Sequence, residues 1–192
     1  MFKSTYYFFR DIIDKRSIVF ELVKRDLQQQ YMGSYLGFIW LFLQPLMFIS
    51  ILYAVFTLGF RAGVSGDMPF SIYLVTGMVA WLHFATNFSA NTGAISGYSF
   101  LVKKVDFRLS ILPIVRMLSS FVAHVFLVIV AICLAWYQGY PPSLFTFQLA
   151  YYLFAMSALL LGLGWMTSST SIFVRDVTKV VAIFVQFGFW LT

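Results

Sequence analysis

Residues 117–174 contain no Asp, Glu, Lys or Arg, which makes a run of 58 uncharged residues. Soluble domains carry about 25% charged residues, whereas this chain carries 10% and is 61% hydrophobic. A helix needs about 20 apolar residues to cross a bilayer, so the run is long enough for two spans. The sequence QGYPP at residues 138–142 predicts a turn between them, because Gly and Pro interrupt helices. We therefore expect a membrane protein with spans at residues 114–137 and 145–167.

Three further apolar runs lie outside this stretch. Residues 36–60 and 70–88 are uncharged and each is long enough to cross the membrane. Residues 180–192 are also apolar, but 13 residues of helix extend only about 20 Å, and the hydrocarbon core is about 30 Å thick. We expect an all-α, polytopic membrane helical bundle with five visible spans, the fifth incomplete, and a natural chain that continues beyond residue 192.

The basic residues are distributed unequally between the two sides of the expected bundle. Of the 13 Lys and Arg residues, 11 fall before the first span, between the second and third, or after the fourth. Arg116 lies at the start of the third span on the same side, and only Arg61 falls on the other side. Because Lys and Arg are enriched in cytoplasmic segments, we expect the N-terminus and the segments 89–113 and 168–179 in the cytoplasm. The net charge of +6 is then a signal of topology, and we expect no nucleic-acid partner.

The N-terminal segment has a helical period of apolar residues between positions 5 and 31. The apolar face consists of Phe9, Ile13, Phe20, Val23 and Leu27. A helix with an apolar stripe and basic flanks can lie in the membrane interface, although an ordinary amphipathic helix packed on other protein has the same pattern. We divide the chain into a cytoplasmic or interfacial amphipathic segment, residues 1–35, and a transmembrane domain, residues 36–192.

The predicted spans lack the residues that catalysis or ion coupling would require. The sequence contains no H-E-x-x-H, G-x-S-x-G or G-x-x-x-x-G-K-[ST] motif, and no carboxylate pair falls within the spans. Cys133 is the only cysteine, which excludes a metal site built on cysteines. His83 and His124 are the only titratable candidates, and a lone His in an apolar helix is more often a packing residue. We expect no enzyme activity, no catalytic residue and no metal site, and an energy source in another subunit.

Aromatic residues are frequent in the first two spans. Trp and Tyr often lie at headgroup level as interfacial anchors, but aromatic faces also bind sugar rings through C–H contacts, so some of them could line a path for a glycan. The candidates for such a path are Trp40, Tyr53, Phe56, Trp81, Phe84 and Phe88. Small residues separately predict close helix contacts at two pairs, Ala158 with Gly162 and Gly33 with Gly37.

The sequence LVKKVDFRLSILP, residues 101–113, places apolar residues in a basic loop between two uncharged segments. Val102, Val105 and Phe107 offer apolar area for a docking cleft, and the Lys and Arg side chains offer long-range attraction. A solvated loop whose charges only set the topology would have the same composition. The residues alone leave both interpretations open.

Four motifs, in order along the chain, resemble those of ABC-2 type permeases, above all the polysaccharide exporters that move O-antigen, teichoic acid or related polymers. The sequence RDLQQQYMGSYLGFIWLFLQPL, residues 25–46, is similar to the entry to the family's first span, and LVTGMVAWLHF, residues 74–84, to its second. The loop at residues 101–113 is similar to the family's cytoplasmic loop. The sequence FVRDVTKVVAIFVQFGFWLT, residues 173–192, is similar to the approach to the fifth span.

This resemblance implies the transmembrane subunit of an ATP-driven exporter with six spans, which moves a lipid-linked, O-antigen-like polysaccharide from the cytoplasm across the bacterial inner membrane. It implies a homodimer paired with two copies of a cytoplasmic ATP-binding subunit, which would hold ATP and Mg²⁺, while this chain holds no cofactor. The loop that would contact that subunit is Leu101, Val102, Lys103, Lys104, Val105, Asp106, Phe107 and Arg108. Lys15, Arg16 and Arg25 would meet a lipid pyrophosphate. Two alternatives stay open: an ABC-2 permease for a small lipid or drug, and a membrane scaffold subunit that transports nothing.

Overall fold

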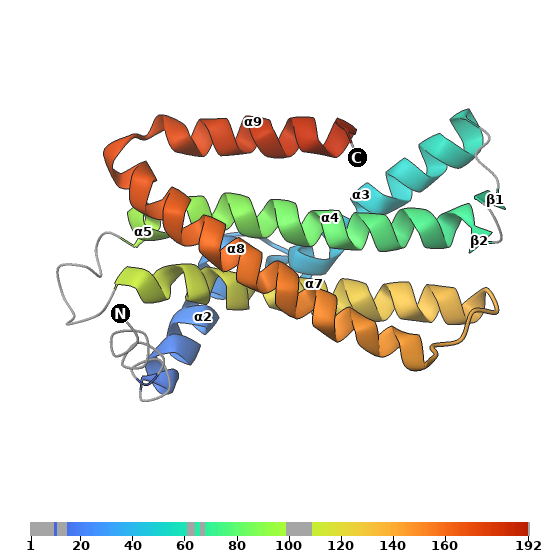
Figure 1. The fold of residues 1–192 in the computed structure, drawn as a ribbon, viewed down its shortest axis with the longest axis horizontal. Coiled ribbons are helices and arrows are strands. Elements are labelled where there is room, and N and C mark those ends of the chain that lie inside the picture. Colours follow the sequence, from blue (N-terminus) through green and yellow to red (C-terminus); the bar gives the residue numbers. More distant parts are fainter. Residues whose placement is uncertain (1–9, 11–14, 61–63, 66–67, 99–108, 192) are drawn as a thin grey trace.

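The computed structural model describes the chain except residues 1–9, 11–14, 61–63, 66–67, 99–108 and 192. Its described elements are helical apart from one antiparallel pair of two-residue strands (Figure 1). In chain order they are α2 (Arg16–Tyr31), η1 (Gly37–Ile39), α3 (Trp40–Ala54), η2 (Val55–Gly59), β1 (Val64–Ser65), β2 (Met68–Pro69), α4 (Phe70–Thr92), α5 (Ala94–Gly97), η3 (Leu109–Ile111), α7 (Leu112–Tyr137), η4 (Leu144–Phe147), α8 (Gln148–Phe173) and α9 (Asp176–Leu191). The prediction of a helical fold is confirmed.

Three segments of the described chain are long and apolar enough to cross a membrane: Gly37–Gly59, Leu109–Tyr137 and Leu144–Phe173. They coincide with the first, third and fourth predicted spans. Helix α4, the predicted second span, has 23 residues, which extend about 35 Å. It does not meet the same criterion of apolarity, because its buried face carries polar residues such as His83 and Asn87. Composition therefore identifies three spans, and α4 is the polar member of the bundle.

Helix α4 lies inside the bundle, between α7 and α9, and α8 crosses it obliquely (Figure 1). Three apolar clusters hold these helices together. The first joins α3, α4 and α7 through Ile49, Val75, Met78, Val79, Leu127 and Ala131. The second joins α4, α8 and α9 through Phe88, Leu160 and Val181. The third lies at the end of α7, where Leu112 packs with Ala94 and Tyr98. The first two clusters hold α4 against its neighbours, and the third connects α5 with the start of α7.

The predicted turn at residues 138–142 is also confirmed. Helix α7 ends at Tyr137, and Gly139 follows with a φ of +90°, a backbone conformation that favours glycine. At the other end of α7, Pro113 lies in the first turn, where the missing N–H of proline costs no helical hydrogen bond. Local sequence therefore sets both ends of this span.

Helix α2 packs against α7 with a face that only partly overlaps the predicted one, since Val23 of the predicted stripe packs against the same cluster. Its buried residues are Val19, Leu22 and Asp26, and the apolar pair packs on Ile111 and Val115. Phe20, which was assigned to the apolar stripe, is 73% exposed. The contact face combines apolar side chains with a carboxylate, so a search for apolar residues alone selects a face rotated away from the buried one.

The predicted close contacts at small residues are not made within the described chain. A Cβ added at Gly162 would meet no atom within 4 Å, and the same holds at Gly33 and Gly37. Gly33 and Gly37 instead have φ values of +84° and +50° in the connection from α2 to α3. The close approach lies two residues further along α8, where a Cβ at Gly164 would be 2.9 Å from Asn91 Cβ. Spacing along one helix does not say which face meets a neighbour.

Candidate functional site

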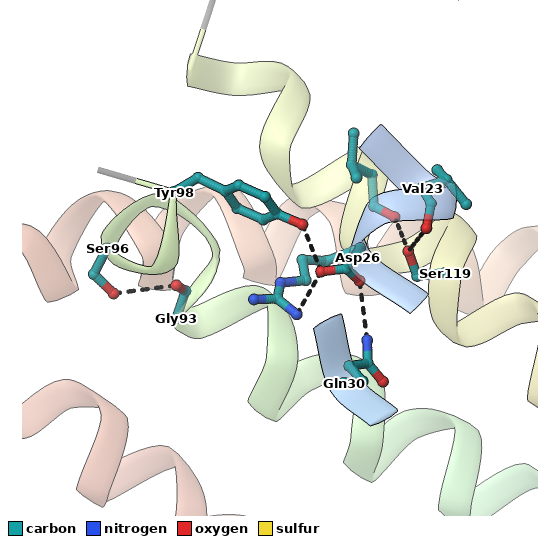
Figure 2. Close-up of polar contacts among 9 residues, drawn as sticks. Val23, Asp26, Gln30, Gly93, Ser96, Tyr98 and Ser119 are labelled. Carbon is teal, nitrogen blue, oxygen red and sulfur yellow. Dashed lines mark hydrogen bonds and ion pairs between the residues drawn. The ribbon is translucent and has the colours of Figure 1, made fainter. Parts of the chain in front are cut away.

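A buried carboxylate joins three helices at the end of the bundle where α2 lies (Figure 2). Asp26 of α2 is 1% exposed. One of its oxygens accepts a hydrogen bond from the Tyr98 hydroxyl, at the end of α5, and lies 2.7 Å from a guanidinium nitrogen of Arg116 in α7. Its other oxygen accepts a hydrogen bond of 3.0 Å from the Gln30 amide. The carboxylate therefore has donors on both of its oxygens. We call Asp26, Tyr98 and Arg116 the Asp26 cluster.

Further contacts hold the members of the Asp26 cluster in place. The Arg116 guanidinium lies over the Tyr98 ring, 5.1 Å from its centroid, a distance typical of a cation–π contact. Burial, and then the hydrogen bond to Asp26, raise the pKa of the Tyr98 hydroxyl far above its usual range. The phenol therefore stays protonated and donates. On the neighbouring turn of α7, the Ser119 hydroxyl donates to the Val115 carbonyl at 3.0 Å and lies 3.5 Å from the Val23 carbonyl of α2.

The energetics of this cluster follow from burial. A buried charge is tolerated when it is paired and hydrogen-bonded, and removing one partner of such a pair typically costs about 3–5 kcal/mol. Arg116 is 23% exposed, so its side chain spans from the buried carboxylate towards the surface. This arrangement connects α2, α5 and α7 through one carboxylate. It can fix the position of α2 relative to α5 and α7.

A second polar group lies deeper in the bundle, between α4 and α7. The rings of His83 and His124 stack with centroids 3.9 Å apart, and the Asn87 amide nitrogen lies 3.1 Å from Nδ1 of His83. Both histidines are buried, and Phe121 contacts each ring with its edge. Each histidine therefore packs against the other. Because the two residues lie far apart in the sequence, the sequence alone does not predict this contact. Among the described residues no three His, Cys, Asp or Glu side chains are grouped to hold a metal ion.

The structure separates the predicted aromatic path residues. Phe56, Trp81 and Phe84 line one cavity of about 740 Å³ together with residues of α3, α4 and α9. Trp40 lines a different cavity of about 300 Å³ between α3, α4 and α7. Tyr53 is exposed, and Phe88 is packed against Leu160 and Val181. Three of the six residues thus line one cavity, and the Phe88 ring packs beside Phe84 with centroids 5.7 Å apart.

The predicted basic contacts lie mostly outside the Asp26 cluster. Arg16 and Arg25 are exposed on α2, and Lys15 is half-buried immediately before it. The predicted loop, residues 101–108, lies outside the described residues. Its described neighbours are Tyr98 on one side and η3 and α7 on the other, so the loop lies between two members of the Asp26 cluster in sequence.

Sequence reasoning missed the Asp26 cluster, although two signals for it were present. Asp26 follows Val19 and Leu22 at spacings of seven and four residues, which places all three on one face of a helix. Arg116 had been assigned only to the topology of the third span. A carboxylate on an apolar helix face and an Arg at the start of a span are candidates for a buried ion pair. The sequence does not show, however, that the two helix faces carrying them are in contact.

These features define a multi-pass helical membrane protein. The sequence profile of the ABC-2 type transporter family matches residues 18–192. The chain therefore belongs to this family of membrane transport proteins.

Among curated proteins, the chain is similar to permeases of polysaccharide export. It is 27% identical over 186 residues to the O-antigen export system permease protein RfbA of Myxococcus xanthus, covering 95% of this chain and 69% of that protein. It is 23% identical over 172 residues to the protein of the same name from Klebsiella pneumoniae, covering 89% of this chain and 65% of that protein. The chain thus spans about two thirds of the length of these relatives.

Proposed function

We propose that this chain is the transmembrane subunit of an ATP-driven exporter that moves a lipid-linked, O-antigen-like polysaccharide out of the cytoplasm. The observation that carries the proposal is the match to the ABC-2 type transporter family over residues 18–192, together with relatives named O-antigen export permeases. The apolar segments Gly37–Gly59, Leu109–Tyr137 and Leu144–Phe173 supply a membrane-embedded body. The proposed location is the bacterial inner membrane, and the distribution of basic residues favours an N-terminus in the cytoplasm.

The partner proposed for this chain is a separate ATP-binding subunit, which membership of the family implies. Two copies of that subunit would pair with a homodimer of this chain, and they would hold ATP and Mg²⁺. The contacting loop would be residues 101–108, whose Lys and Arg side chains provide long-range attraction and whose apolar side chains provide docking area. Residues 1–35 would form the cytoplasmic or interfacial segment and residues 36–192 the transmembrane domain.

Within this proposal the substrate is guided without covalent chemistry. The cavity lined by Phe56, Trp81 and Phe84 offers aromatic faces against which sugar rings can pack. Exposed Arg16 and Arg25, with Lys15, provide positive charge for the pyrophosphate of the lipid carrier. Tyr53, Trp40 and Phe88 extend the aromatic set along the first two spans.

The test is deletion of the gene in cells that make a lipid-linked glycan, followed by measurement of where the polymer lies. We expect long glycan to accumulate inside the cells and the complete permease to restore export. Accumulation of a small lipid or drug with normal glycan export would instead favour a permease for small molecules.

A second experiment addresses the partner. We expect the complete permease to co-purify with an ATP-binding protein, and the joint change of Lys104→Ala and Phe107→Ala to weaken that association. The exposed Lys179 gives a control, Lys179→Ala, which should retain the partner. A permease that exports glycan with no ATP-hydrolysing partner would overturn the proposal.

A further inference from the structure

Asp26 is the point at which the elements flanking residues 99–108 meet α2. Tyr98 ends the described chain before that segment, and Arg116 lies one turn into α7, after η3. Both side chains bind the same oxygen of the Asp26 carboxylate. Figure 2 shows the Tyr98 hydroxyl pointing towards it. The contact spans 72 residues of sequence between Asp26 and Tyr98. One carboxylate thus connects α2 with α5 and α7 at once.

The apolar contacts of α2 lie in the same interface. Val19 and Leu22 pack on Ile111 and Val115, and Asp26 lies one turn further along the same face. Apolar contacts tolerate small shifts, because dispersion attraction has no preferred direction. A carboxylate with donors on both oxygens requires those donors at defined positions, since hydrogen bonds weaken steeply away from linearity. The Asp26 cluster therefore fixes the register of α2 on α7, while Val19 and Leu22 supply the buried area.

The connection from α2 to the first span is short. Helix α2 ends at Tyr31 and η1 begins at Gly37, and the intervening turn closes with hydrogen bonds from the Ser34 amide to the Tyr31 carbonyl and from the Gly37 amide to the Ser34 carbonyl. A displacement of α2 is therefore passed to α3 over a few residues. Because Asp26 also binds α5 and α7, the same displacement involves the elements on both sides of residues 99–108.

We propose that Asp26, Tyr98 and Arg116 are positioning residues that hold α2, α5 and α7 as one unit, so that movement at the cytoplasmic end of α5 and α7 is passed to the first span. This role rests on the proposed function as an ATP-driven exporter. It assigns to the Asp26 cluster the coupling between ATP hydrolysis in the partner and movement of the substrate. It requires no contact of these three residues with ATP or with glycan.

The experiment measures two rates for the complete permease with its ATP-binding partner in proteoliposomes: ATP hydrolysed and substrate moved. The variants are Asp26→Asn, which keeps the shape and removes the charge, and Tyr98→Phe, which removes one hydroxyl and keeps the ion pair. We expect Asp26→Asn to lower the substrate moved per ATP by about tenfold or more, and Tyr98→Phe to lower it by about threefold. The double variant Asp26→Arg with Arg116→Asp should recover part of the loss.

The exposed pair Asp176 and Lys179 provides the matched control, since its side chains are 75% and 78% exposed with a nitrogen–oxygen distance of 3.2 Å. Asp176→Asn should leave the ratio unchanged. A purely structural role predicts that both rates fall together with the amount of assembled complex, so an unchanged ratio in Asp26→Asn and Tyr98→Phe overturns the proposal. If Asp26→Asn does not assemble, Tyr98→Phe decides by the same ratio.

Failure of this inference differs from failure of the proposed function. If the unmodified complex moves no glycan but moves another substrate, the proposed function is wrong, and the ratio for that substrate still tests the Asp26 cluster. If the unmodified complex moves glycan and the variants keep its ratio, the proposed function stands and the coupling role of the cluster is wrong.

Discussion

Asn91 and Gly164 occupy the contact between α4 and α8. Asn91 is fully buried, and its amide atoms have no hydrogen-bond partner among the described residues. A Cβ at residue 164 would lie 2.9 Å from the Asn91 Cβ, which is closer than two such carbon atoms can approach. Thr92 adds a hydrogen bond of 3.0 Å to the Thr167 hydroxyl one turn further, so the helices cannot separate freely. Glycine at 164 is therefore required by packing.

We expect Gly164→Ala to destabilise the protein by about 1–3 kcal/mol, the usual range for overpacking of a close contact. Gly162→Ala is the matched control on the same helix, because a Cβ there meets no atom within 4 Å. It should be neutral or stabilising by up to about 1 kcal/mol, as glycine is a poor helix former. The measurement is the thermal unfolding midpoint of both variants in the same detergent. Equal midpoints would contradict the close contact between α4 and α8 at Gly164.

At the scale of elements, the connection between α2 and α3 depends on backbone conformation. Gly33 has a φ of +84° with open space around it. A side chain at this position meets no steric obstacle from neighbours, and its cost comes only from the left-handed backbone, about 1–2 kcal/mol. The turn therefore constrains the residue type without any packing contact.

We expect Gly33→Ala to lower stability by about 1–2 kcal/mol, because alanine resists a positive φ. Gly77→Ala in α4 gives the comparison, since its position is also open but its backbone is helical. That variant should be as stable as the original or slightly more stable. Chemical denaturation of both variants, followed by tryptophan fluorescence, distinguishes them. Equal losses would place the cost in packing and not in the turn.

A prediction for α2 concerns its basic residues. Replacing Lys15 and Arg16 together with Ala should reduce glycan export while assembly with the ATP-binding partner stays intact. Each basic group near an anionic lipid surface contributes about 1 kcal/mol, so binding of a lipid pyrophosphate would weaken by up to about 30-fold. Export is measured by the amount of glycan at the cell surface, and Lys179→Ala is the control on a distant helix. Unchanged export would remove Lys15 and Arg16 from the substrate site.

At the scale of the whole molecule, topology can be tested with cysteine labelling. After Cys133→Ala removes the exposed native thiol, Lys103→Cys should react with a membrane-impermeant reagent only when the cells are opened. Arg61→Cys is expected on the opposite side and should react in intact cells. The reason for the difference is that the distribution of basic residues favours the cytoplasm for residues 89–113, which include Lys103. Labelling of residue 103 in intact cells would indicate the opposite orientation. It would also remove the basis for a cytoplasmic partner at this loop.

The spans were predictable because partition into lipid is a local property of sequence. Each helix must satisfy its own backbone hydrogen bonds in the bilayer, so an uncharged run of sufficient length becomes a helix whatever its neighbours do. The runs at residues 36–60, 114–137 and 145–167 therefore match the segments Gly37–Gly59, Leu109–Tyr137 and Leu144–Phe173 to within six residues at each end. The turn at residues 138–142 was predictable for the same reason, since Gly and Pro act on the adjacent backbone.

The helix faces were not predictable in the same way. The amphipathic pattern of the N-terminal segment assigned Phe20 to the apolar stripe, but the face of α2 that meets α7 contains Asp26. The pair Ala158 and Gly162 was assigned to a helix contact, but Gly164 makes it. In both cases the contact is made with another helix that is distant in sequence. The periodicity of residues within one helix therefore does not predict it.

The sequence by itself determined that this protein is a multi-pass membrane protein of the ABC-2 type, because charge depletion, length and four ordered motifs are properties of the chain alone. Only the tertiary structure decided that Asp26, Tyr98 and Arg116 share one buried cluster and that His83 stacks on His124. The physical reason is that transfer into lipid sums over each segment separately, whereas a buried polar contact exists only where two particular helix faces meet.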